Sequence, residues 1–148
     1  MKLRHFVKYI SSFVLATCLL CSVAFPAKAS TMRASDYFDF TLAYIDTKPN
    51  GNLSIHFSVG SLSFMDKLGA TTIHLYEDSG NGFKRIKTFS SDDREFSYMM
   101  NYNVALCNES VPYKGTVGND YYAVIYAYAE NQYGSDSDSV TTSVVTAS

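Results

Sequence analysis

The sequence predicts an all-β domain, built as a two-sheet antiparallel sandwich of about seven strands. Apolar and polar residues alternate with a period of two in several segments, most clearly in residues 53–59. Turn-forming residues separate these segments at intervals of roughly ten residues, and no long helical pattern lies between them. The succession of strands without long helices between them therefore argues against an α/β fold.

A secretory signal peptide is predicted before this domain, over residues 1–29. Lys2, Arg4 and Lys8 form its charged start, an apolar run follows over residues 10–25, and a small-x-small cleavage site ends at Ala29. The apolar run is too short to span a bilayer as a helix. We therefore expect cleavage after Ala29 and secretion of the remainder.

The remainder, residues 30–148, has the size of one domain. It contains eight Lys and Arg and fourteen Asp and Glu, a net charge of −6. This charge disfavours nucleic acid and anionic membranes as partners, since both require a basic surface. We expect no membrane span and no cofactor in the mature chain.

Cys107 is the one cysteine that remains after cleavage, so no intrachain disulfide can form. An exported domain without disulfides is more typical of bacteria than of eukaryotes. Cys107 is interpreted as a small buried hydrophobe; a nucleophile or an intermolecular bridge are the alternatives.

In the first half of the domain, strands are predicted over residues 37–45 and 53–59, joined by a turn at 48–52. Residues 62–69 are predicted to include a helical turn, which stops at Gly69. The predicted core residues are Leu53, Ile55, Phe57, Val59, Ile73, Leu75, Ile86 and Ile125.

A hairpin is predicted next, with strands over residues 71–77 and 83–89 and a glycine-rich loop at 78–82. Its second strand contains a basic cluster that is typical of an edge strand, namely Lys84, Arg85 and Lys87.

Three further strands are predicted in the second half, over residues 96–102, 121–129 and 140–145. Residues 103–120 are left unassigned apart from a short apolar piece at 111–113. Residues 121–129 are apolar on both faces, as a central strand should be.

The last third resembles the end of a fibronectin type III domain, a fold of the immunoglobulin-like class. The residues on which this rests are Tyr121, Ala129, Asn131, Gly134, Ser135 and Ser139. The hairpin over residues 73–89 looks like the middle hairpin of the same fold. By its spacing from Asn131, the family's corner tyrosine falls at Ala123, two positions after Tyr121.

Residues 64–73 and the hairpin at 80–89 resemble a group of small exported proteins of unknown function from Gram-positive, often gut-dwelling, bacteria. This resemblance implies a secreted sandwich and supplies no activity, ligand or catalytic residue.

No catalytic arrangement is evident in the mature sequence. His56 and His74 fall on the polar sides of their strands, and a metal shared by them would need a third ligand that nothing marks. Acidic pairs occur near Asp92 and in the segment with Asp136 and Asp138, where solvated turns are the expectation. Asp136 and Asp138 remain a weak calcium candidate.

The aromatic residues are more informative. In residues 121–129 one side of the strand has mostly small residues, and the other has Tyr122, Tyr126 and Tyr128. If the small side faces the core, these tyrosines form an outward row that Tyr76 extends. Such a row would suit sugar rings or peptides. Two alternatives stay open: the rings stabilise the sheet as cross-strand pairs, or they face the core.

We therefore expect a secreted, non-catalytic binding or adhesion-type module, with a glycan, a cell-envelope component or a protein as ligand. One alternative is a structural or assembly protein whose exposed edge strand pairs with a partner chain. The other is a small extracellular hydrolase that uses acidic residues or Cys107.

Overall fold

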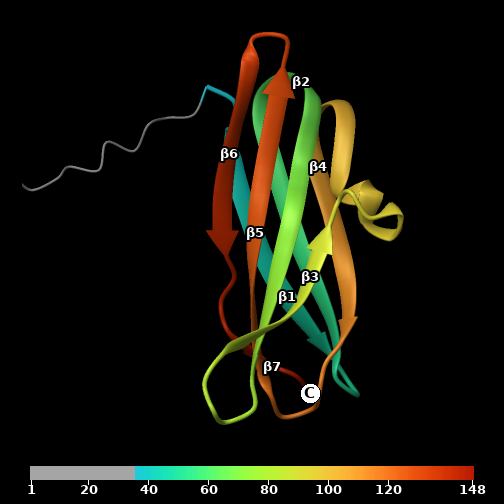
Figure 1. Ribbon diagram of the computed structural model, residues 1–148, viewed down its shortest axis with the longest axis vertical. Coiled ribbons are helices and arrows are strands. Elements are labelled where there is room, and N and C mark those ends of the chain that lie inside the picture. The colour runs from blue at the N-terminus through green and yellow to red at the C-terminus, as the bar shows by residue number, and fades with distance from the viewer. Residues whose placement is uncertain (1–35) are drawn as a thin grey trace, which may run out of the picture. The chain divides into compact units, whose positions relative to one another are not determined.

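The computed structural model describes residues 36–148, so the predicted signal peptide lies outside the described residues. Every strand pairing is antiparallel, which confirms the all-β antiparallel prediction (Figure 1). No helix among these residues is long and apolar enough to cross a membrane. The elements in order are β1 (Phe40–Lys48), β2 (Asn52–Asp78), β3 (Lys84–Ser90), the 3-10 helix η1 (Arg94–Met99), β4 (Met100–Lys114), β5 (Asp120–Asn131), β6 (Gly134–Thr141) and β7 (Val145–Thr146).

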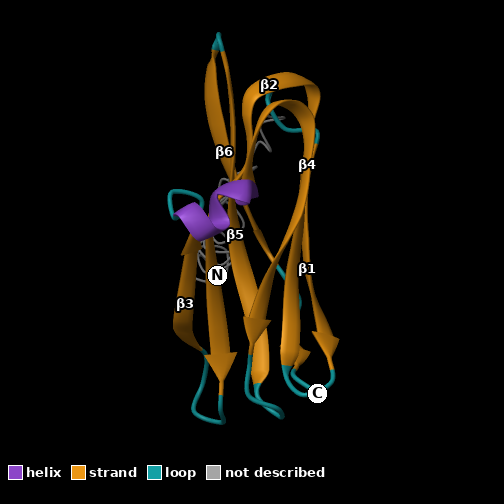
Figure 2. Ribbon diagram, turned by 90° about the vertical axis from the view of Figure 1, so that its right-hand side faces the viewer, coloured by secondary structure: helices purple, strands orange, loops and turns teal. Residues whose placement is uncertain are grey.

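The long strand β2 organises the sheet. Its first half, residues 52–60, lies between β1 and β4, and its second half pairs with β5 over residues 67–78 and with β3 over 72–77. Strand β5 then pairs with β6 and β7. Because β2 takes part in both halves, the seven strands form one hydrogen-bonded sheet that curls on itself (Figures 1 and 2). The two-sheet sandwich stays a prediction.

The core lies inside this curl and is built by strand alternation. Seven of the eight residues predicted for the core are buried. The exception is Ile86, which is 36% exposed. The pairing of β2 with β3 slips here, so that Leu75 lies opposite Lys87 and Tyr76 opposite Arg85. Ile86 is therefore the extra residue of a bulge, and its prediction as a core residue is wrong.

The predicted helical turn at residues 62–69 is also wrong, because this segment is part of β2. Met65 and Leu68 are buried three positions apart, a spacing that resembles a helix, but their segment pairs with β4. Residues 61–64 bulge out of this pairing, since Gly60 pairs with Leu106 and Met65 with Val104. A local bond supports the bulge: the Ser61 hydroxyl donates to the Ser63 carbonyl over 2.6 Å.

The strand predicted over residues 96–102 begins later than expected, because residues 94–99 form η1. Two features favour the helix: Phe96 meets Phe89 edge-on, with centroids 5.1 Å apart, and Met99 is fully buried. Most of the unassigned segment 103–120 belongs to β4. This strand tolerates Pro112 because β2 is its one partner among the described strands.

The strands at the end of the chain have other bounds than the sequence predicted. The strand predicted over residues 140–145 corresponds to the end of β6 and the short β7, and β6 already begins at Gly134. The edge position predicted for the basic strand is confirmed, since β3 pairs only with β2 among the described strands.

Candidate binding face

Strand β5 presents two chemically different sides. Its small side is buried, with at most 1% exposure at any of Tyr121, Ala123, Ile125, Ala127 and Ala129. The tyrosines of the other side point outward, and Tyr126 is 39% exposed. The alternative in which these tyrosines face the core is therefore wrong.

The outward side of β2 and β5 gathers all four predicted tyrosines, and we call Tyr76, Tyr122, Tyr126 and Tyr128 the tyrosine face. Tyr76 lies directly opposite Tyr122 across the two strands. Further along β5, Tyr126 lies opposite Thr72 and Tyr128 opposite Gly69. The row lies on two central, neighbouring strands, so backbone pairing on both sides holds its position.

At one end of the tyrosine face the rings are held against one another. The rings of Tyr76 and Tyr122 stack with centroids 4.7 Å apart and planes 2° from parallel. Phe83, which directly precedes β3, meets Tyr122 edge-on at 4.8 Å. Phe83 is a member of this cluster that the sequence analysis did not include.

In the middle of the face, Tyr126 packs against His74, with an edge-on ring contact of 5.1 Å. The Nη1 atom of Arg85 lies 3.5 Å from Nε2 of His74, within reach of a hydrogen bond to the neutral ring. Partial burial, and secondarily the charge of Arg85, lower the pKa of His74 below its ordinary value of 6.5. Both effects favour the neutral imidazole.

A small polar network closes the other end of the face. The Tyr128 hydroxyl donates to Oε2 of Glu130 over 2.6 Å, and Nζ of Lys67 lies 3.0 Å from the same oxygen. The hydrogen bond from Tyr128, and then that from Lys67, lower the pKa of Glu130. Glu130 in turn raises the pKa of Lys67. The network fixes the position of the Tyr128 ring.

On the neighbouring strand β6, hydroxyl side chains border the tyrosine face. Thr141, Ser139 and Ser137 lie opposite Val124, Tyr126 and Tyr128, respectively. Between Arg85 at one end and the Lys67–Glu130 pair at the other, the paired residues of this face are uncharged. The arrangement offers apolar ring surfaces beside hydroxyl groups, which is a surface suited to an uncharged polar ligand.

The remaining candidates do not join this face. Asp136 and Asp138 lie within β6 rather than in a turn, opposite Ala129 and Ala127 on the core side. Each accepts the amide of the following serine at 2.8 Å. No group of three or more metal-ligating side chains occurs within residues 36–148.

His56 and His74 have separate surroundings. Nε2 of His56 lies 3.5 Å from a carboxylate oxygen of Asp46, and its ring stacks on Tyr44.

The Cys107 side chain is buried, and burial raises the pKa of its thiol to about 12. Because the protonated form is not the nucleophile, the Cys107 thiol is a poor nucleophile at neutral pH.

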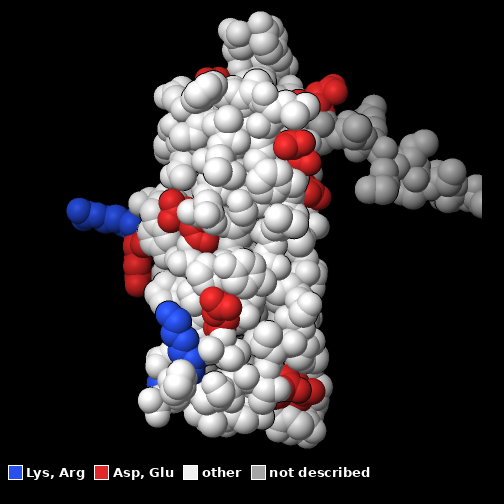
Figure 3. Space-filling model, turned by 180° about the vertical axis from the view of Figure 1, so that it is seen from behind, with Lys and Arg blue, Asp and Glu red and all other residues white. Residues whose placement is uncertain are grey.

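The structure also exposes an apolar group that sequence reasoning missed, on the outward side of β1, β2 and β4. Phe40 lies over Gly60, and Leu106 lies on the other side of the same glycine. Figure 3 views the molecule from behind, where Asp and Glu are spread and Lys and Arg follow one margin. Leu42, Leu62, Phe64 and Leu106 belong to this apolar group and are 54–79% exposed.

A signal for this second group was present in the sequence. Serine alternates with Leu62 and Phe64 in residues 61–64, which indicates a strand with one apolar side rather than a helix. Comparison with known proteins adds nothing to either surface, since the chain matches no family model, no curated protein and no solved structure.

Proposed function

We propose that this protein is a secreted, non-catalytic binding module whose tyrosine face recognises a glycan, a cell-envelope component or another protein. The observation behind it is the row of four outward tyrosines on two central strands. Their rings are already fixed by stacking, by His74 and by Glu130. Rings that are fixed before binding lose little conformational entropy when a ligand covers them.

The fold proposed for this module is a fibronectin type III or immunoglobulin-like sandwich. The strand order supports it: β1, β2 and β4 are neighbours in one half, and β3, β2, β5 and β6 in the other. Tyr121 supports it further, because its buried hydroxyl accepts the Thr116 amide at 2.7 Å and also bonds to Glu77. This resembles the tyrosine corner of such folds, placed two residues earlier than the family spacing expects.

Secretion is the proposed location, and a bacterial source is proposed with it. The charged start, the apolar run and the cleavage site at Ala29 support export. Cys107 supports the non-catalytic part, because burial and a raised pKa make its thiol a poor nucleophile. A broad hydrolase panel tests this part, and any turnover that Asp→Asn changes abolish would replace the binding module with the hydrolase alternative.

The binding proposal is tested by NMR titration of the protein expressed from its full-length sequence, with neutral glycans and cell-wall fragments as probes. We expect shifts to cluster at Tyr122, Tyr126 and Tyr128. Tyr126→Ala should weaken binding about tenfold or more, since a ring at the centre of an interface contributes most.

The matched control is Tyr44→Ala, which removes an exposed tyrosine from the outward side of β1. This variant should bind as the wild type does. Equal binding by wild type and Tyr126→Ala, or shifts that cluster around Tyr44 and Leu106, would show that the tyrosine face is not the binding surface.

A further inference from the structure

Two strands end the sheet on opposite sides of the β2–β5 pair. Strand β3 pairs only with β2 and strand β6 only with β5, among the strands of the described residues (Figure 1). Nearly every residue of either strand is exposed, apart from Phe89 and a few half-buried positions. Unpaired strand edges are templates on which another strand can add.

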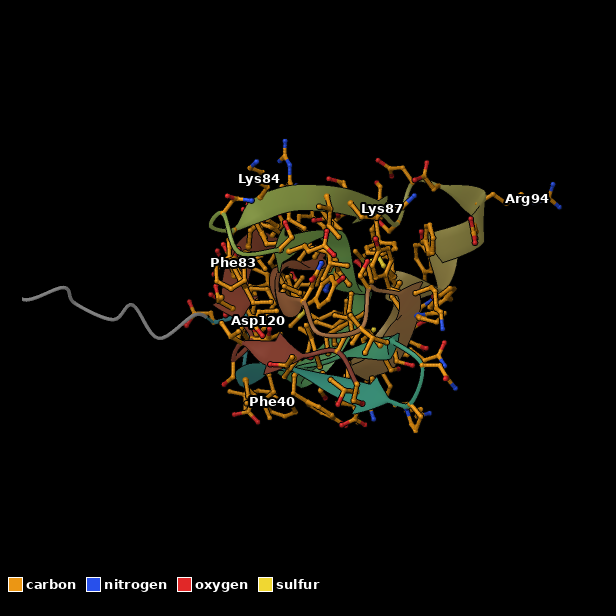
Figure 4. All side chains as sticks on the ribbon, turned by 90° about the horizontal axis from the view of Figure 1, so that it is seen from below. Phe40, Phe83, Lys84, Lys87, Arg94 and Asp120 are labelled. Atoms are coloured by element: carbon orange, nitrogen blue, oxygen red, sulfur yellow. The ribbon has the colours of Figure 1, made fainter. Side chains whose placement is uncertain are left out.

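These two edges have opposite charge. Strand β3 contains Lys84, Arg85 and Lys87 and no acid, whereas β6 contains Asp136 and Asp138 and no Lys or Arg. Figure 4 shows Lys84 and Lys87 along β3 on the outside of the molecule. No carboxylate of the described residues forms an ion pair with these three basic groups. Like edges therefore repel each other, and the basic edge attracts the acidic one.

The strand directions allow the two edges to join. The strands β3, β2, β5 and β6 are neighbours in this order, and each is antiparallel to the next. Strands β3 and β6 consequently run in opposite directions. When β3 of a second copy lies beside β6 of the first, with both copies in the same orientation, the sheet continues as an antiparallel sheet.

The charges also match in register. Because Ile86 bulges out of the ladder, Lys84 and Lys87 fall opposite Glu77 and Leu75 on the same side of the sheet. Asp136 and Asp138 lie on the core side of β6, opposite Ala129 and Ala127. One antiparallel register therefore places Lys84 against Asp138 and Lys87 against Asp136, with all four side chains on the same side.

We propose that this protein associates with further copies of itself by adding the β3 edge of one copy to the β6 edge of the next. The contact joins two different surfaces, so at the two ends of such a chain of copies one basic edge and one acidic edge are not covered by another copy. Head-to-tail contacts of this kind produce open chains of copies unless the rotation closes a ring. Salt weakens the contact by screening the charges.

The contact competes with bonds inside β6. Oδ1 of Asp136 and Oδ1 of Asp138 accept the amides of Ser137 and Ser139, which satisfies donors along this strand. Pairing exchanges these local bonds for bonds to the second copy. Association is therefore reversible and depends on protein concentration.

The test is sedimentation velocity of the protein expressed from its full-length sequence, over a range of concentration at low and high salt. We expect the mean mass to rise with concentration at low salt and to fall on adding salt. Lys84→Asp with Lys87→Asp gives a copy with two acidic edges, and Asp136→Lys with Asp138→Lys gives a copy with two basic edges. Each should associate at least about tenfold more weakly than wild type.

Mixing the two double variants supplies the decisive measurement, because an acidic edge again meets a basic one. The mixture should associate more strongly than either double variant alone. The matched control reverses charges away from both edges, with Lys48→Glu and Asp66→Lys, and should leave wild-type association unchanged. A wild type that stays monomeric throughout, or a mixture that does not associate, would overturn the proposal.

Discussion

The two outward surfaces of this domain both stack an aromatic ring across neighbouring strands, but they hold their rings differently. Tyr76 and Tyr122 lie on the central strands β2 and β5, 4.7 Å apart, with Phe83 against the pair. Tyr44 and His56 stack at the same 4.7 Å, but Tyr44 lies on β1, which pairs only with β2 among the described strands, and is 55% exposed.

This difference indicates that the more exposed apolar surface is not necessarily the better binding surface. The outward side of β1, β2 and β4 exposes more of each side chain: Leu42 is 60% exposed and Leu106 54%, against 39% for Tyr126. The tyrosine face exposes less of each ring but fixes it through contacts with its neighbours. Fixed rings lose less entropy on binding, so the smaller exposed area can provide the stronger site.

The largest predicted loss of stability comes from truncating the core that lies beneath both surfaces. Ile55 lies beneath the outward side of β1 and Ile125 beneath the tyrosine face, and both are fully buried in the same cluster. Ile55→Ala and Ile125→Ala should each lower the free energy of unfolding by about 2–5 kcal/mol, through lost burial and the cavity that remains. Urea denaturation measures both, and an unchanged midpoint for either would contradict its placement in the core.

The next effect tests the difference in ring fixation directly. Tyr122→Ala removes the stack with Tyr76 and the contact with Phe83, and should cost about 2 kcal/mol. Tyr44→Ala removes one stack from a more exposed ring, and should cost at most about 1 kcal/mol. Denaturation midpoints at one pH compare the two variants. Equal losses would show that the two surfaces do not differ in how they hold their rings.

The sequence suggested the tyrosine face, with a core-facing row left open as an alternative, because the responsible pattern is local. Alternation with period two, with small residues at Ala123, Ala127 and Ala129, determines which side of β5 packs inward. The same logic predicted the burial of Ile55 and Ile73. Where alternation is regular, residue type is enough to assign the sides of a strand.

The predictions from sequence were wrong where strand pairing, rather than the alternation of apolar and polar residues, determines which residues are buried. Ile86 is exposed because the register of β3 against β2 slips by one residue, and the local sequence does not specify that slip. Residues 61–64 bulge because β4 offers one residue, Ala105, opposite four. The edge role of β6 likewise depends on which strands are its neighbours, whereas the edge role of β3 was predicted from its basic cluster.

The smallest predicted effect concerns His74, which links the tyrosine face to Arg85. Burial and the Arg85 charge lower its pKa in the folded state below the ordinary 6.5 that the unfolded chain retains. As the pH falls through 6.5, the unfolded state binds the proton first, so the free energy of unfolding decreases until the folded-state pKa is passed. His74→Gln cannot titrate, and should lose less stability than wild type between pH 7 and 5. Urea denaturation at these two pH values measures the difference, which we expect to be smaller than the effect of deleting either tyrosine ring. Identical losses in wild type and variant would mean that His74 titrates alike in both states, and that Arg85 does not bias its charge.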